Sequence, residues 1–156
     1  MVETKNVYGL PAAHDAIKEA NRSRSPAHIG SLEKSVDFIL KRPIGTPVVA
    51  AGDGIIVDLK DGSDTGGDDK KFEQYGNFVE IEHVNGEYSE YEHLQKGIPV
   101  KIGQRVKKGQ VIAYSGATGW LAGLGPHLHF MVGRYGKTID DYETLEPRFE
   151  EKIKIT

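Results

Sequence analysis

The chain has 156 residues, enough for one domain with a substantial hydrophobic core. Hydrophobic residues make up 38% and charged residues 28%, which excludes fibrous and disordered classes. A formal net charge of -3 gives no argument for a nucleic-acid or membrane partner. Because the chain has no cysteine, disulfides and thiolate metal sites are excluded, and any transition metal must be held by His, Asp and Glu.

Helix signals are few and lie near the two ends of the chain. Residues 12–21, which follow Pro11, predict a short helix. Residues 140–151 are acidic and only faintly periodic, and they predict at most a second one. No stretch approaches the roughly 20 apolar residues that a membrane span needs.

Short runs rich in valine and isoleucine, separated by turn residues, fill the middle of the chain. Residues 46–59 predict a hairpin around a Gly-Asp-Gly turn, and residues 60–75 predict a long exposed loop. Residues 77–83 and 87–94 alternate in polarity around Asn85-Gly86, which is a strong two-residue hairpin signal.

The C-terminal half continues this pattern. Residues 102–113 predict two short strands around a Lys-Lys-Gly turn, and a glycine-rich loop, 116–125, leads into a strand over 127–132. Residues 45–59 and 103–116 form a weak internal repeat. Together these segments predict an all-β fold, a compact antiparallel sandwich or barrel-like domain with long loops around a groove and little helix.

The densest chemical pattern is Gly125-Pro126-His127-Leu128-His129-Phe130. Residues two apart on a strand point the same way, so His127 and His129 project together while the apolar residues face the opposite side. The two imidazoles could share a metal, or one could bind the metal while the other handles protons. The alternative is a pair of surface histidines on a half-exposed strand.

A second pattern joins His28 to Asp37, which stands between two apolar residues. If its face is buried, the carboxylate needs a metal or a strong hydrogen-bond partner; the alternative is a solvent-facing aspartate on an edge strand. Two histidines and one carboxylate leave a tetrahedral zinc one open position for a water, whose pKa the metal lowers to about 7. Nitrogen and oxygen ligands would also suit other divalent metals.

The order of these motifs resembles the lysostaphin-type (LytM-type, β-lytic) zinc metallopeptidases. The resemblance runs from about His28 to Val132 and rests on His…Asp-Phe, Gly-Thr-Pro-Val, Gly-Asn-X-Val-X-Ile-X-His, Tyr-X-His-Leu and Gly-Pro-His-Leu-His-Phe, in that order. It implies an endopeptidase that hydrolyses peptidoglycan crosslinks or bridges. It also implies a single domain with an N-terminal extension, a catalytic core and a C-terminal segment, spanning residues 1–27, 28–132 and 133–156.

The resemblance also implies roles for single residues. One Zn²⁺ per chain would be bound by His28, Asp37 and His129, and the catalytic residues His93 and His127 would flank the metal water. The chain departs from the shorter family form, in which His and Asp are four residues apart. Here they are nine apart, which indicates a longer loop and leaves His14 as the alternative ligand.

The loop before the His-X-His pair is also longer than usual. Its apolar residues Trp120, Leu121 and Leu124 could line a substrate groove or pack onto the barrel. His83, which shares a face with two apolar residues, is expected to be structural rather than catalytic.

Two other functions share parts of this pattern. Degenerate members of the family act as binding modules that activate other cell-wall hydrolases, but those lose metal ligands, and this chain has kept them. A lipoyl- or sugar-phosphotransferase-type carrier is disfavoured, because Lys107-Lys108 lacks the context of a modifiable lysine and a phosphorelay needs no Asp37.

The sequence leaves the bond cleaved and the oligomeric state open. Residues 1–15 lack the apolar core of a signal peptide. The location is therefore undetermined. The protein would be extracellular or associated with the cell wall if it is exported, if it is released by lysis, or if the sequence is trimmed from a longer chain.

Overall fold

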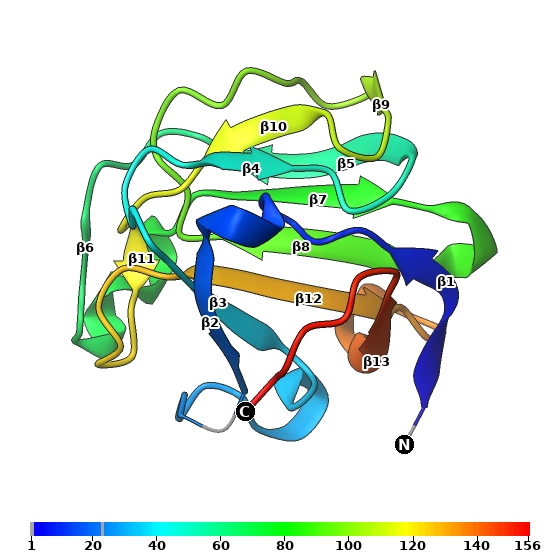
Figure 1. The fold of residues 1–156 in the computed structure, drawn as a ribbon, viewed down its shortest axis with the longest axis horizontal. Helices are drawn as coiled ribbons and strands as arrows, with labels where there is room; N and C mark the ends of the chain where they lie inside the picture. The colour runs from blue at the N-terminus through cyan, green and yellow to red at the C-terminus, as the bar shows by residue number, and fades with distance from the viewer. Residues whose placement is uncertain (1, 23) are drawn as a thin grey trace.

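The computed structural model describes residues 2–22 and 24–156, which form a strongly curled all-β fold (Figure 1). The strands are β1 (Glu3–Tyr8), β2 (Ile17–Asn21), β3 (Val36–Leu40), β4 (Pro47–Val49), β5 (Gly54–Lys60), β6 (Gly66–Gly67), β7 (Phe78–Glu82), β8 (Tyr88–Glu92), β9 (Arg105–Val106), β10 (Val111–Tyr114), β11 (Gly119–Trp120), β12 (Leu128–Arg134) and β13 (Glu143–Phe149). The helical segments of the described residues are short 3₁₀ turns: η1 (His14–Ala16), η2 (Gly30–Leu32), η3 (Lys70–Tyr75), η4 (Val84–Gly86) and η5 (Ile139–Asp141).

The main sheet has the order β1-β13-β12-β8-β7-β5-β9, and β12 lies at its centre. On one side β12 pairs with β8 along most of its length. On the other side it pairs with β3 near its start and with β13 near its end. Two-stranded sheets, β10-β4 and β11-β6, complete the fold. No helix among the described residues is long and apolar enough to cross a membrane.

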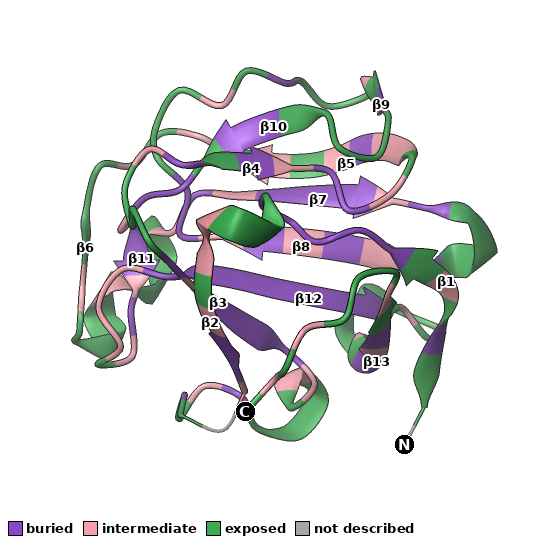
Figure 2. Cartoon of the chain, viewed as in Figure 1, coloured by how far each residue is buried: buried purple, intermediate pink, exposed green. Residues whose placement is uncertain are grey.

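Strand β12 is buried on both faces (Figure 2). Phe130 points into the main core, where its ring centroid lies 5.3 Å from that of Tyr91 and 6.2 Å from that of Phe38. Each such fully buried apolar side chain contributes roughly 1.5–3 kcal/mol to stability. The alternate residues, among them His129, point to the opposite face. The core therefore holds the strand that presents the His-X-His pair.

The β7–β8 hairpin forms where it is predicted, but its connection has three residues, Val84–Gly86, because His83 N–H donates to the Glu87 carbonyl at 2.8 Å. Asn85 and Gly86 both have a φ of +65°, the left-handed conformation that this tight turn requires. The other predicted hairpin, 46–59, is wrong, and so is a direct pairing within 102–113. β4 pairs with β10 and β5 pairs with β9, so the two similar segments pair with each other instead of folding back on themselves.

The helix predicted over 12–21 is also wrong. Only His14–Ala16 forms a 3₁₀ turn, and Ile17–Asn21 is strand β2. Pairing with β3 and burial of Ala20 outweigh the helical propensity of this segment. At the other end, η5 is short, and strand β13 occupies most of 140–151, between β12 and β1.

The two predicted loops meet beside the sheet. Residues 60–75 contain β6 and η3, and β6 pairs with β11 from the glycine-rich loop (Figure 1). A Cβ atom on Gly66 would lie 1.8 Å from the carbonyl oxygen of Ala117, so this close approach requires glycine. The pairing holds Trp120 at the edge of a cleft that His93 and His129 also line.

Candidate metal centre

The register of four neighbouring strands places one row of side chains across the sheet. Asp37 of β3 lies opposite His129 of β12, and His129 lies opposite Glu92 of β8. Asn21 of β2 lies opposite Asp37 on its other side. Directly opposed residues of antiparallel strands point to the same face. The sheet itself therefore brings a carboxylate and an imidazole together, although they are far apart in the sequence.

His28 completes a group of three from the segment before η2. Its Nε2 lies 3.3 Å from Asp37 Oδ1 and 3.4 Å from His129 Nδ1, and the last two atoms are 3.2 Å apart. A tetrahedral zinc with bonds of about 2.0–2.1 Å would have ligand atoms roughly 3.3–3.4 Å apart. Among the described residues, these three form the one group of His, Asp and Glu with ligand atoms so closely spaced. The triangle fits zinc.

Burial makes this arrangement costly without a cation. The exposed fractions are 0% for Asp37, 7% for His129 and 9% for His28, and Asp37 Oδ2 has no hydrogen-bond partner among the described residues. An unpaired carboxylate in such surroundings would be strongly destabilising. The chemistry of the site therefore agrees with a metal held by all three side chains.

Each of three histidines is oriented by a backbone carbonyl. In each case the ring donates from Nδ1 to a carbonyl oxygen. His28 donates to Arg22 at 2.9 Å, His93 donates to Thr118 at 2.7 Å, and His127 donates to Gly125 at 2.9 Å. A carbonyl oxygen only accepts, so Nδ1 carries the proton and Nε2 is left free. The free nitrogen is the one that can bind a metal or accept a proton.

His127 and His93 lie beside the group of three. His127 Nε2 is 3.5 Å from Asp37 Oδ1, and the rings of His93 and His127 are 4.5 Å apart. His93 also has a φ of +64°, which is uncommon for a residue other than glycine. Backbone strain of this kind concentrates at functional sites, which supports a functional role for His93.

The pKa values of these groups diverge. Burial alone would raise the pKa of Asp37, but the imidazole rings of His129 and His28 beside it hold that pKa far below its usual range. Burial would lower the pKa of His129, yet Glu92 and Asp37 outweigh burial and raise it to about 9.

The two flanking histidines are shifted the other way. Burial, aided by His127 and His129, lowers the pKa of His93 to about 3. Burial also lowers the pKa of His127, against the opposing effect of Asp37. Both are therefore neutral at physiological pH, as a proton acceptor must be.

A cleft of about 360 Å³ opens onto the site between the segment around η2 and the β6–β11 pair. It is lined by Pro26, Ala27, Ile29, Leu32, Lys70, Glu73, Gly76, Glu92, His93, Gly119, Trp120 and His129. Trp120 thus lines the cleft, as one of the two interpretations of its loop predicted. Leu121 does not: it is only 6% exposed and packs inside.

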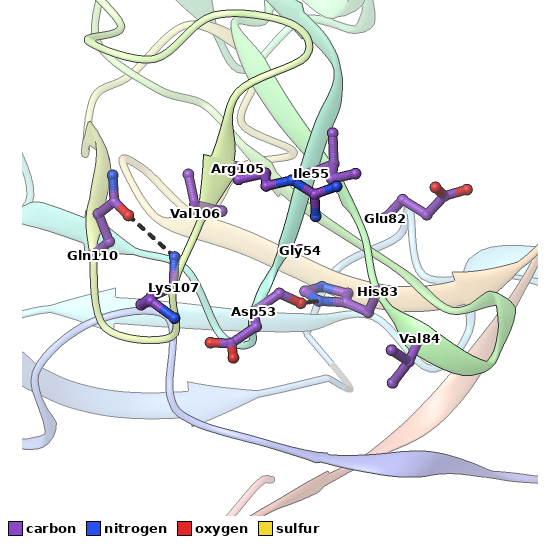
Figure 3. A pocket seen from close by; sticks show the side chains of 10 residues that line it. All are labelled: Asp53, Gly54, Ile55, Glu82, His83, Val84, Arg105, Val106, Lys107 and Gln110. Atoms are coloured by element: carbon purple, nitrogen blue, oxygen red, sulfur yellow. Dashed lines mark hydrogen bonds between the residues drawn. The ribbon is translucent and has the colours of Figure 1, made fainter.

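A separate hollow of about 650 Å³ lies beside β5 and β9 and shares no residue with this cleft (Figure 3). His83 at its edge donates from Nδ1 to the Asp53 carbonyl at 2.8 Å, so its Nε2 accepts from Ser89 at 2.7 Å. Both ring nitrogens are used in hydrogen bonds within the protein. His83 therefore holds the fold together, as the sequence predicted.

Three observations bear on the ligand set expected from the sequence. The residue four positions before Asp37 is Glu33, which is exposed and pairs with Lys34 at 3.0 Å. His14, the alternative ligand, is exposed in η1. Glu92, with Oε2 3.7 Å from His129 Nε2, was not predicted. Only the register between β8 and β12 reveals it.

Comparisons with known proteins place the chain in a family. The model of Peptidase family M23 matches residues 31–141, more than half of the chain. The chain belongs to peptidase family M23. The lysostaphin-type resemblance and the all-β fold are thereby confirmed. His28 lies just before the matched M23 segment, so its place in the site rests on the geometry above.

Two relatives and two solved structures illustrate the likeness. Peptidoglycan DD-endopeptidase ShyC of Vibrio cholerae is 42% identical over 62% of this chain and 19% of its own length. Glycyl-glycine endopeptidase ALE-1 of Staphylococcus capitis is 40% identical over 65% of this chain and 24% of its own length. The chain therefore spans a quarter or less of these two curated relatives.

Among structures, a zinc-containing peptidase from Vibrio cholerae has a TM-score of 0.57 at 35% identity, covering 81% of this chain and 36% of that one. The catalytic domain of lysostaphin from Staphylococcus simulans has a TM-score of 0.56 at 28% identity, covering 81% of this chain and 87% of that one.

One testable consequence concerns Glu90, two residues before Glu92 on the same face of β8. Burial, with the carboxylates of Glu92 and Glu80, raises the pKa of Glu90 well above its ordinary value. When the pKa of a carboxyl group is higher in the folded state than in the unfolded state, the protein loses stability as the pH rises from the unfolded pKa through the folded one. We expect Glu90→Gln to raise the Tm of the metal-free protein at pH 7.5.

The gain should vanish below about pH 4, where the unfolded carboxyl is also protonated. Thermal unfolding across that pH range measures it, with exposed Glu73→Gln as the control. An equal change in Tm at both ends of the range would contradict the expectation.

Proposed function

We propose that this chain is a zinc-dependent endopeptidase that hydrolyses peptide bonds in peptidoglycan crosslinks or bridges. The observation that supports this best is the buried triangle of His28 Nε2, Asp37 Oδ1 and His129 Nδ1, with sides of 3.2–3.4 Å. The names of the M23 relatives, which act on peptidoglycan and on glycyl-glycine bonds, support the substrate class.

In this proposal His28, Asp37 and His129 are the zinc ligands. Bound there, zinc would supply Lewis-acid activation of a water molecule and of the scissile carbonyl. The ligand atoms are two neutral imidazole nitrogens and one carboxylate oxygen, a set typical of catalytic zinc. Their burial keeps the centre in surroundings of low dielectric, where charge interactions are strong.

His127 and His93 are the proposed catalytic residues. The Gly125 carbonyl fixes the His127 ring so that Nε2 faces the site, where it accepts the proton of the attacking water. The Thr118 carbonyl fixes His93 in the same sense. His93 is proposed to stabilise the charge that develops on the scissile carbonyl oxygen once its Nε2 has taken up a proton, because its Nδ1–H is already donated to Thr118. Neither ring depends on a mobile side chain for its orientation.

We further propose that residues 1–156 act as one metallopeptidase unit, with 28–132 as the catalytic core. Strands β1 and β2 from the N-terminal segment, and β13 from the C-terminal segment, pair directly with strands of the same sheet. This supports a structural role for both segments. The alternative, a non-catalytic module that activates another hydrolase, gains no support from a site in which all five side chains are present.

The test is digestion of purified crosslinked peptidoglycan of two kinds, one with direct D-amino-acid crosslinks and one with glycine bridges. We expect the zinc-loaded protein to release new free amines from one of them, and mass spectrometry of the new N-termini names the bond. If neither is cut although the protein holds one zinc per chain, the proposed activity is wrong.

A further inference from the structure

The four histidines of the centre are not oriented in the same way. His28, His93 and His127 each donate Nδ1–H to a backbone carbonyl. His129 is the exception: its Nδ1 lies 3.2 Å from Asp37 Oδ1, and once a metal takes up that nitrogen the ring proton sits on Nε2. Glu92 Oε2 lies 3.7 Å from Nε2. The ring of His129 thus depends on a side chain, and not on a backbone carbonyl, for its orientation.

We propose that Glu92 is a positioning residue of the metal centre, whose carboxylate accepts Nε2–H of His129 and so fixes the tautomer that presents Nδ1 to the metal. The inference rests on the proposed zinc site. It rests equally on the register, because β8 and β12 pair these two residues directly. Metal-binding histidines commonly donate their second N–H to a carboxylate, which fixes ring orientation and raises ligand basicity.

The separation is about 0.5 Å longer than an N–H···O hydrogen bond of at most about 3.2 Å. The Glu92 side chain is 32% exposed and has no hydrogen bond or ion pair to any other described residue, so a small rotation closes the gap. His129, at 9% side-chain exposure, stays in place. The carboxylate is therefore the part that moves.

Glu92 also lines the cleft, where a carboxylate could instead recognise a cationic group of the substrate. The two roles have different signatures. A positioning residue changes the affinity for zinc in the absence of substrate. A recognition residue changes KM and leaves zinc affinity as it was.

The experiment measures the zinc dissociation constant of the full chain by competition with a chromophoric chelator. We expect Glu92→Ala to bind zinc about 10–100-fold more weakly, the usual cost of losing an outer partner of a ligand. Glu92→Gln keeps an acceptor oxygen and should recover most of the affinity. The matched control is Glu73→Gln, an acidic residue of the same cleft, which should bind zinc like wild type.

A spectroscopic readout separates this role from a merely structural one. In the zinc-loaded wild type, the Nε2–H proton of His129 should be visible by NMR and slow to exchange, and Glu92→Ala should shift it or lose it. Unchanged zinc affinity and an unchanged proton signal in Glu92→Ala would overturn the inference, and a change in KM alone would assign substrate recognition instead.

The inference and the proposed function fail in different ways. If wild type binds no zinc, or if His129→Ala binds it equally well, the proposed metal site is wrong. If zinc binding needs His129 but is indifferent to Glu92, only the positioning role is wrong.

Discussion

Replacing His129 with alanine should abolish tight zinc binding and, with it, activity. The Nδ1 atom of His129 is one corner of the triangle, 3.2 Å from Asp37 Oδ1 and 3.4 Å from His28 Nε2. Loss of an outer partner already costs about 10–100-fold in metal affinity, so loss of a direct ligand should cost more than about 100-fold. Metal analysis and chelator competition measure it.

His14→Ala is the matched control for this variant. His14 is also a histidine, but it is exposed and lies outside the group of three. The His14→Ala protein should bind one zinc per chain and keep full turnover. If His129→Ala held zinc as tightly as His14→Ala does, the triangle would not be the metal site.

Replacing His127 with alanine should separate zinc binding from catalysis. His127 Nε2 lies 3.5 Å from Asp37 Oδ1, near the triangle but outside the group of closely spaced ligand atoms. We expect zinc affinity within a few-fold of wild type and kcat lowered by about 10²–10⁴, the usual contribution of a general base. Steady-state kinetics on the cleaved peptidoglycan, with zinc content measured on the same sample, test both parts.

Two results would contradict this assignment. Loss of zinc from His127→Ala would make His127 a ligand and not a base. Full turnover by zinc-loaded His127→Ala would show that His127 has no part in the mechanism. His93→Ala is an informative companion, because His93 is proposed to act on the carbonyl oxygen and should also keep its zinc.

Local patterns predicted the parts of the fold that depend on neighbours in the sequence. Asn85-Gly86 predicted the β7–β8 hairpin because its left-handed backbone is set by the two residues themselves. The His-X-His pair predicted two side chains on one face because alternation belongs to any strand. The burial of Leu128 between them follows from the same alternation.

Features that depend on distant segments were not predictable in this way. Residues 17–21 form a strand because β3 lies beside them, and β4 and β5 pair with β10 and β9 because the two similar segments associate. The partnership of Glu92 with His129 exists only through the register of β8 against β12. Each of these needs the topology and not the local sequence.

His28 is an intermediate case. The nine-residue spacing alone argues against His28 as a ligand, because the short family form would place the ligand histidine at position 33, where the chain has Glu33. The structure shows why the longer spacing works: His28 reaches the site from the segment before η2, and its ring is held by the carbonyl of Arg22. The family resemblance supplied the candidate and the three distances support it.

The most direct test of the central claim is a zinc titration of the metal-stripped protein with amine release from peptidoglycan as the readout. We predict no release from the stripped protein, and a linear return of activity that saturates at one zinc per chain. The same titration of His129→Ala should restore nothing. Amine release that is independent of zinc, or that returns equally in His129→Ala, would contradict a zinc peptidase built on His28, Asp37 and His129.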